Sequence, residues 1–196
     1  MTNRLHITGD DRADALLSTD ANALLIGMVL DQQDRLEKAF AGPAVIAERM
    51  GGSLDVAAIA GMEEGAFVEL CSRRPSIHRF PASMAKRIQQ MCRVLVDDHE
   101  GDATNLWASA DSGAAVRTAI GSLPGFGAQK AAIFTALLGK QYGVTPPGWR
   151  EAAGDYGQDG YRSVADIVDS DSLAKVRSTK SEAKKAAKAD AAPAVS

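Results

Sequence analysis

The stretch "GSLPGFGAQKAAIFTALLGK", from Gly121 to Lys140, decides how this chain folds. A proline is followed by Gly125 and Gly127, two positions apart, and then by an alanine-rich segment. The apolar residues of that segment recur at helical spacing, which gives a helix one apolar face: Ile133, Phe134, Leu137 and Leu138. Residues 111–120 also favour a helix. The pattern therefore predicts two helices joined by a tight hairpin over residues 121–127.

The hairpin has a chemical consequence. Glycines leave backbone N–H groups uncovered by side chains, and these groups lie at the N-terminus of the second helix, where the helix dipole is positive. Such a site accepts a phosphate oxygen without distinguishing one base from another. Lys130, in the first turn, adds a positive charge beside it. The hairpin is therefore a candidate anion site, although a glycine turn between helices is also a common structural device.

The rest of the chain favours helices and shows no period-two strand pattern. Asp20 is a candidate N-cap for one long helix over residues 21–40. We expect an all-α fold of about ten short helices with short connections. Residues 1–175 are predicted to form the helical domain. Residues 176–196 are predicted to form an Ala/Lys-rich tail that is partly helical or disordered.

Charge is distributed unevenly. The net charge is −3, but Ser172–Ser196 holds six basic and two acidic residues, which leaves −7 on residues 1–171. Two windows of this acidic body, Cys71–Val96 and Ser112–Arg150, contain basic residues and no Asp or Glu. On one face they would form a positive patch; solvated helix faces are the other explanation. The basic tail is a candidate non-specific DNA tether or only a soluble end.

Composition excludes several classes. Cys71 and Cys92 are the only cysteines, too few for a disulfide framework or for a four-cysteine metal or iron–sulfur site. We expect both to be buried thiols in a reducing compartment. The N-terminus lacks an apolar signal region, and no run approaches the ~18 apolar residues of a membrane span. A cytoplasmic protein with no membrane partner is expected.

Three segments resemble one family. "LPGFGAQKA" resembles the helix-hairpin-helix motif, and "LLIGMVLDQQDRLEKAF" is similar to an early helix of the helix-hairpin-helix DNA glycosylase superfamily, HhH-GPD. "HRFPASMAKRIQQMCRVLV" resembles the lysine-bearing helix that precedes the hairpin there. Together the segments cover about residues 20–145 in the family's order. The resemblance is to small members of uncertain activity that carry no iron–sulfur cluster.

The resemblance implies a two-lobed helical fold that binds double-stranded, possibly damaged DNA and is nucleoid-associated. Gln33, with Gln32 beside it, matches the residue that enters the space left by a flipped base. The implied DNA-binding set comprises Gln33, Arg87, Gly125, Gly127, Gln129 and Lys130. In relatives, hairpin carbonyls hold a monovalent cation. Here these would be Gly121, Leu123 and Phe126, with K⁺ or Na⁺.

Two departures from the family bear on chemistry. The lysine nucleophile of bifunctional members is replaced by Gln129, and Lys130, one position later, points elsewhere on a helix. We therefore expect no lyase chemistry. The family aspartate is expected at Pro147, Gly148 or Trp149, where no carboxylate stands. Asp155 is the only plausible substitute, and its other interpretation is a loop or capping residue.

Three functions remain open at this point. The protein is a base-excision-repair enzyme that resembles a monofunctional DNA N-glycosylase acting on a flipped damaged base. Alternatively, it is a catalytically inactive DNA- or lesion-binding protein without the family aspartate. In the third interpretation, the hairpin mediates protein–protein contact. Enzyme activity is therefore uncertain from sequence, and the lesion and the oligomeric state are not encoded in any motif.

Overall fold

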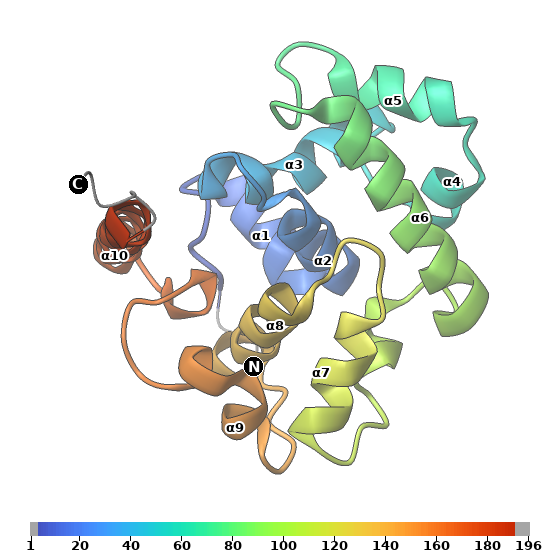
Figure 1. The fold of residues 1–196 in the computed structure, drawn as a ribbon. Coiled ribbons are helices and arrows are strands. Elements are labelled where there is room, and N and C mark those ends of the chain that lie inside the picture. Colours follow the sequence, from blue (N-terminus) through green and yellow to red (C-terminus); the bar gives the residue numbers. More distant parts are fainter. Residues whose placement is uncertain (1–3, 191–196) are drawn as a thin grey trace.

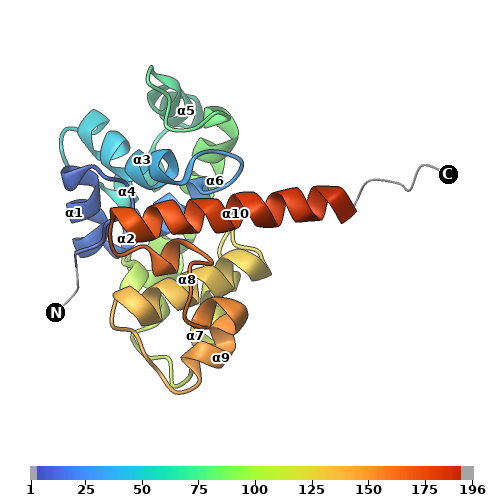
Figure 2. The same cartoon turned by 90° about the vertical axis from the view of Figure 1, so that its left-hand side faces the viewer.

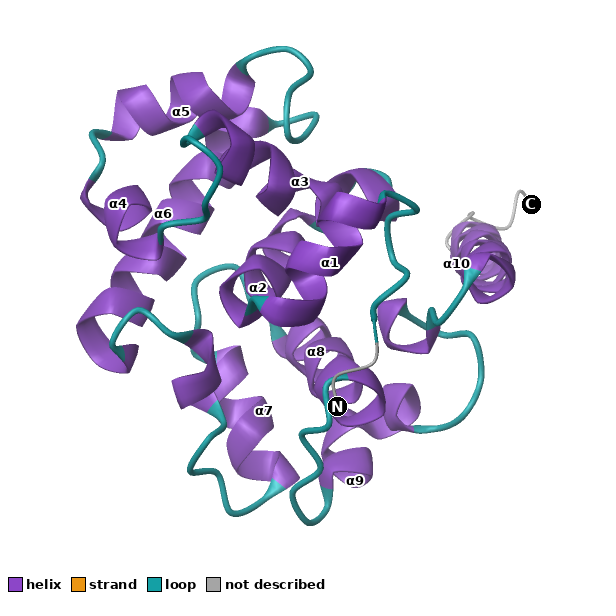
Figure 3. Cartoon of the chain, turned by 180° about the vertical axis from the view of Figure 1, so that it is seen from behind, coloured by secondary structure: helices purple, strands orange, loops and turns teal. Residues whose placement is uncertain are grey.

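The computed structural model describes residues 4–190, and this part of the chain contains ten α-helices and no strand (Figures 1 and 3). The helices are α1 (Asp11–Thr19), α2 (Ala21–Leu30), α3 (Leu36–Arg49), α4 (Val56–Gly61), α5 (Glu64–Ser72), α6 (Pro81–His99), α7 (Gly113–Gly121), α8 (Ala128–Gln141), α9 (Trp149–Ala153) and α10 (Ser170–Asp190). Short 3₁₀ turns span Ala103–Leu106, Gly154–Gly157 and Val164–Asp166. The predicted all-α fold is confirmed.

Helix α2 is the centre of the fold. Every residue of it except Asn22 is buried, because the segment is apolar on all sides and must be surrounded. Asn22 itself is satisfied, since its amide donates to the carbonyl of Gly101 at 3.0 Å and accepts from the N–H of Ala103 at 2.9 Å. Burial and the Asn22 hydrogen bonds therefore fix the position of α2 among the helices that surround it.

Two groups of helices flank α2 (Figure 1). On one side, α4 and α5 pack on α6, and α3 packs on α2; on the other side, α7 and α9 pack on α8. These two groups are the two lobes of the fold. One continuous hydrophobic core runs through both groups. The hairpin between α7 and α8 faces the group that contains α6 across the end of α2. The hairpin and α6 therefore lie on opposite sides of the place where the two lobes meet.

The single helix expected over residues 21–40 is wrong. Helix α2 ends at Leu30 and α3 begins at Leu36, and Gln33 between them has a φ of 58°. Only a few residue types adopt this left-handed conformation readily. The break is held from outside the segment: the buried His78 ring bonds the Gln32 carbonyl at 2.8 Å. These tertiary contacts outweigh the local preference for helix.

The C-terminal segment folds as α10, a long helix whose C-terminal half projects beyond the rest of the chain (Figure 2). Val176 is 1% exposed and anchors the helix, and Arg177 pairs with Glu37 of α3. The predicted boundary between residues 175 and 176 falls inside this helix. Of the predicted tail, residues 191–196 lie outside the described residues.

The two cysteines lie in the core. Cys71 and Cys92 are buried as predicted, and burial raises the pKa of both thiols to about 12. No cluster of three metal-ligating His, Cys, Asp or Glu side chains occurs within residues 4–190. No single helix in that range is long and apolar enough to cross a bilayer, and α1 and α2 meet the criterion only as a pair bent by 117°.

Candidate nucleic-acid interface

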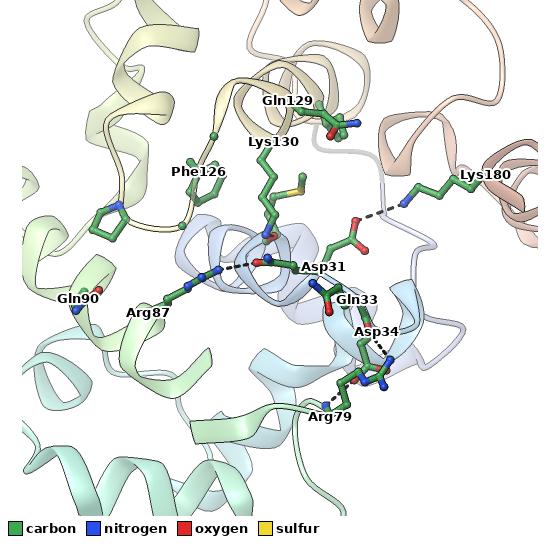
Figure 4. Close-up of a pocket in the computed structure, with 16 residues that line it drawn as sticks. Asp31, Gln33, Asp34, Arg79, Arg87, Gln90, Phe126, Gln129, Lys130 and Lys180 are labelled. Carbon is green, nitrogen blue, oxygen red and sulfur yellow. Dashed lines mark hydrogen bonds and ion pairs between the residues drawn. The ribbon is translucent and has the colours of Figure 1, made fainter. Parts of the chain in front are cut away.

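A cleft of about 1280 Å³ opens between the two lobes (Figure 4). Its walls are the loop after α2, the first half of α6, the hairpin with the start of α8, and one residue of α10. Four cations and two carboxylates line it: Arg79, Arg87, Lys130, Lys180, Asp31 and Asp34. All six DNA-binding candidates from the sequence lie on its walls: Gln33, Arg87, Gly125, Gly127, Gln129 and Lys130.

The hairpin is a β-turn anchored by its apolar residues. The N–H of Phe126 donates to the Leu123 carbonyl at 3.1 Å, with Pro124 and Gly125 at the two central positions. Gly125 has a φ of +89°, the value that a type II turn requires at its third residue. Leu123 and Phe126 are buried, and the Phe126 ring meets Phe134 edge-on at 5.8 Å between centroids. The bend is therefore rigid.

The backbone amides of the bend are available to a ligand. Within residues 4–190, no acceptor bonds the N–H of Gly125 or Gly127. Gly127 is the exposed N-cap of α8, so its neighbouring amides carry the partial positive charge of the helix end. Leu123 and Phe126 are buried, but Gly125 is half-buried and Gly127 is exposed, and the cleft beside them holds more cations than carboxylates, so an anion can reach the bend.

The ammonium group of Lys130 is bonded to the end of α2 as well as facing the cleft. Its Nζ donates to the carbonyls of Met28 and Val29, at 2.8 Å each, and so caps the C-terminal end of α2, where backbone carbonyls lack helical partners. Burial lowers the pKa of this amine to about 8; Asp31 opposes that effect and Arg87 adds to it. Lys130 thus joins α8 to α2. An ammonium group has three N–H donors, so one remains for a ligand.

The loop after α2 presents Gln33 at its tip. Gln33 is exposed, whereas the Oε1 atom of Gln32 accepts from Arg87 at 2.6 Å. Behind the loop, His78 accepts the N–H of Phe80 on Nδ1 at 3.0 Å and contacts the Gln32 carbonyl through Nε2. Both ring nitrogens of a fully buried histidine are thus occupied. This support holds Gln33 toward the cleft.

The two carboxylates of the cleft are engaged. Asp34 accepts the N–H of Arg79 at 2.8 Å and contacts Lys38 at 3.2 Å. Burial raises the pKa of Asp34, but hydrogen bonds from Arg35, Arg79 and Lys38 outweigh this and hold it below its usual value. Asp31 pairs with Lys180 of α10 at 3.5 Å. The cations outnumber the carboxylates, so the cleft stays positive overall on an acidic molecule.

The family model described as "HhH-GPD superfamily base excision DNA repair protein" matches residues 26–194. The match extends from within α2 through the hairpin to the C-terminal segment. The chain belongs to the HhH-GPD superfamily. Membership places it in base excision DNA repair, with DNA as the molecule on which it acts. Neither the curated proteins nor the solved structures contain a match to the chain.

A second cavity of about 600 Å³ adjoins the cleft of this HhH-GPD protein. The two share Gln129, Ile133 and Lys180 as a common wall. Asp155 lines the second cavity but not the first, and its side chain is exposed. Gln129, which the motif resemblance matches to the family's nucleophile, donates to the Tyr156 hydroxyl at 2.9 Å. Asp155 therefore stands near this position on the adjoining cavity.

The segment in which the HhH-GPD aspartate was expected has a packing role. Trp149 lies so close to α8 that a Cβ on Gly139 would come within 2.2 Å of its ring. The Pro147 carbonyl accepts the N–H of Gly113 at 2.8 Å. Neither Pro147, Gly148 nor Trp149 lines the two cavities. The segment at which the resemblance placed the family aspartate therefore joins α9 to α7 and α8.

The hairpin carbonyls fit the monovalent cation that the HhH-GPD resemblance implies. Gly121 ends α7, so its carbonyl lacks a following helical partner. The Leu123 carbonyl accepts one bond, from Phe126, and keeps a second lone pair. Neutral carbonyl oxygens suit K⁺ or Na⁺ better than a transition metal. The cation itself remains a proposal.

Several residues of the cleft were missed from sequence. Asp31 and Asp34 belonged to a segment assigned to a helix. Lys180 was part of the basic tail. The run "DQQD" gave no clear signal of the break, because glutamine favours helices and only the two aspartates disfavour them.

Proposed function

We propose that the protein binds double-stranded DNA across the cleft and releases a damaged base as a monofunctional DNA N-glycosylase. One observation carries the proposal: the same cleft is lined by four cations, by the exposed Gln33, and by Gly125 and Gly127, whose N–H groups have no acceptor within residues 4–190. Amides and cations are what phosphate binding needs, and a protruding polar side chain such as Gln33 is what can occupy the position that a flipped base leaves. Their convergence from four separate segments supports a nucleic-acid ligand.

The steps follow from the positions of the side chains. The hairpin amides of Gly125 and Gly127 would hold phosphate oxygens, and Arg87 and Lys130 would add positive charge beside them. Gln33 would enter the duplex where the damaged nucleotide leaves it. The extruded base would then occupy the adjoining cavity, whose volume of about 600 Å³ falls within the range of small-molecule pockets.

The reaction expected here is hydrolysis. Gln129 has no nucleophilic nitrogen, because an amide lone pair is delocalised, and so a covalent lyase intermediate is not expected. Cleavage of the glycosylic bond develops positive charge on the sugar, which a carboxylate stabilises. Asp155 on the second cavity is one candidate for that carboxylate, and Asp31 on the first is another.

A second candidate function is binding without chemistry. It is favoured by the absence of a carboxylate at Pro147–Trp149 and by the packing role of that segment. In this version the same cleft binds damaged or abasic DNA and protects or marks it. Both versions predict DNA binding, and they differ only in base release.

Two measurements test the proposal. Binding to a labelled duplex over a salt series should weaken steeply, since each phosphate contact releases counterions. Weak binding that does not change with salt would reject the DNA interface and favour protein–protein contact through the hairpin. Release of a base from a panel of duplexes, each with one damaged base, supports the glycosylase. Binding without release from any duplex supports the second candidate.

A further inference from the structure

Asp31 occupies an unusual position in the cleft. It is the C-cap of the buried α2, so its backbone is fixed by the core of the protein. Its carboxylate lines the cleft together with Gln129 and Lys130 and is only 13% exposed. A charge in such a concave and poorly hydrated place acts more strongly than one in open solvent. Asp155, by contrast, is exposed.

The structure also shows what this carboxylate attracts. The ammonium group of Lys180, which reaches the cleft from α10, lies 3.5 Å from Asp31 (Figure 4). Lys180 keeps 42% of its side chain exposed, so it can turn away at little cost. The pair marks a place for a cation in the cleft, beside the wall that the two cavities share. DNA phosphates would offer Lys180 an alternative partner.

We infer that Asp31 is the carboxylate that stabilises the positive charge on the sugar during base release, and that Lys180 occupies this position until DNA binds. The inference rests on the proposed function. In the reaction, the bond from sugar C1′ to the base nitrogen breaks, and both electrons leave with the base, which takes up a proton. A water oxygen then bonds C1′ and gives up a proton. Asp31 forms no covalent bond.

The arrangement explains why the position of the usual aspartate can be lost. A carboxylate that acts by charge alone needs to be near the sugar and shielded from water, but it does not have to come from a particular helix. The C-terminal end of α2 reaches the cleft from one lobe, and Gln129 from the other. Asp31 therefore supplies from α2 what Pro147–Trp149 no longer provides.

The test compares two duplexes that differ in one charge. One carries a tetrahydrofuran abasic site, which is neutral, and the other carries a pyrrolidine at the same place, which is protonated and resembles the charged sugar. We expect the protein to bind the pyrrolidine duplex at least tenfold more tightly. Asp31→Asn should remove this preference and leave tetrahydrofuran binding within about twofold. Asp98→Asn, which changes an exposed aspartate of α6 that lines neither cavity, is the control and should leave the preference unchanged.

The outcomes separate the inference from the proposed function. Wild-type protein that binds neither duplex overturns DNA binding itself. Wild-type protein that binds both duplexes equally, or an Asp31→Asn variant that keeps the preference, overturns only the role of Asp31. If Asp31→Asn does not fold, Lys180→Ala serves instead. It empties the position beside Asp31, so the preference should rise, and a fall would contradict the inference.

Discussion

The Nζ atom of Lys130 lies 2.8 Å from the carbonyl oxygen of Val29, so the first turn of α8 is bonded to the last turn of α2. The two residues are 101 positions apart in the chain. This contact sets the distance between the hairpin, which would hold phosphates, and the loop that carries Gln33. It also leaves a partly buried ammonium in the cleft, whose pKa of about 8 is close to physiological pH.

DNA binding should therefore depend on pH through Lys130. Raising the pH from about 7 to about 9 removes the charge of an amine with a pKa of about 8, and we expect the dissociation constant to rise several-fold. Lys130→Arg keeps its charge in this range and should bind with no such pH dependence. A titration of affinity by fluorescence anisotropy measures both, and equal pH dependence in the two proteins would show that another group titrates.

The same lowered pKa affects stability with a defined sign. Between about pH 8 and the ordinary lysine value of 10.5 the unfolded chain binds more protons at this residue than the folded chain. The contribution of Lys130 to the free energy of unfolding should therefore rise with pH across this window. The free energies of unfolding of wild type and Lys130→Met, measured with urea at several pH values, give the contribution of Lys130 as their difference. If the stability of wild type relative to the variant falls as the pH rises, the prediction is wrong.

Gln33 should show opposite effects on stability and on function. Its φ of 58° is strained for a side chain, so Gln33→Gly is expected to stabilise the protein by about 1 kcal/mol. The same change removes the side chain that would fill the vacated base position, and the preference for abasic over intact duplex should fall about tenfold, equal to ~1.4 kcal/mol. Gln33→Asn, which tolerates this backbone and keeps an amide, serves as the control.

Arg87 is expected to contact phosphate without base preference. Arg87→Ala should weaken binding to all duplex sequences by a similar factor and reduce the salt slope by about one. The neighbouring Lys86 points away and pairs with Glu64 at 2.7 Å, so Lys86→Ala is a matched control that should change little. A loss confined to one sequence would assign Arg87 to a base rather than to the backbone.

Substitution of Gly125 should lower the stability of the protein, whereas substitution of Gly127 should lower its affinity for DNA. Gly125→Ala forces a side chain into a φ of +89° and is expected to cost about 1–2 kcal/mol of stability. Gly127 has a φ of −88° and open space around its Cβ position, so Gly127→Ala should fold normally. Its added methyl group stands near the exposed amides and should weaken duplex binding. Thermal unfolding and DNA affinity, measured on both variants, separate the two effects.

Sequence was sufficient for features that depend on neighbouring residues. Pro124 and Gly125 specify a turn by their own backbone preferences, and the apolar period that follows specifies α8. The motif resemblance to HhH-GPD rests on the same short segments, and the family model confirms it. The cysteines, too, were assigned as buried thiols, because two are too few for a disulfide framework or a four-cysteine site.

Features that depend on contacts between distant residues could not be predicted in this way. The break between α2 and α3 follows from bonds that His78 and Arg79 make across the fold, at 2.8 Å to the Gln32 carbonyl and to Asp34. A local pattern contains no information about such partners. The helix preference of residues 21–40 was therefore a reasonable expectation that tertiary contacts reversed.

The amino-acid sequence by itself determined the helical fold, the hairpin with its bare amides and the family, because turn chemistry and apolar periodicity act over a few residues. Only the tertiary structure decided that Asp31, Lys130 and Lys180 share one cleft, and that the segment at Pro147–Trp149 serves packing. The physical reason is that the strength of a charge depends on what surrounds it in space, and those surroundings come from helices far apart in the chain.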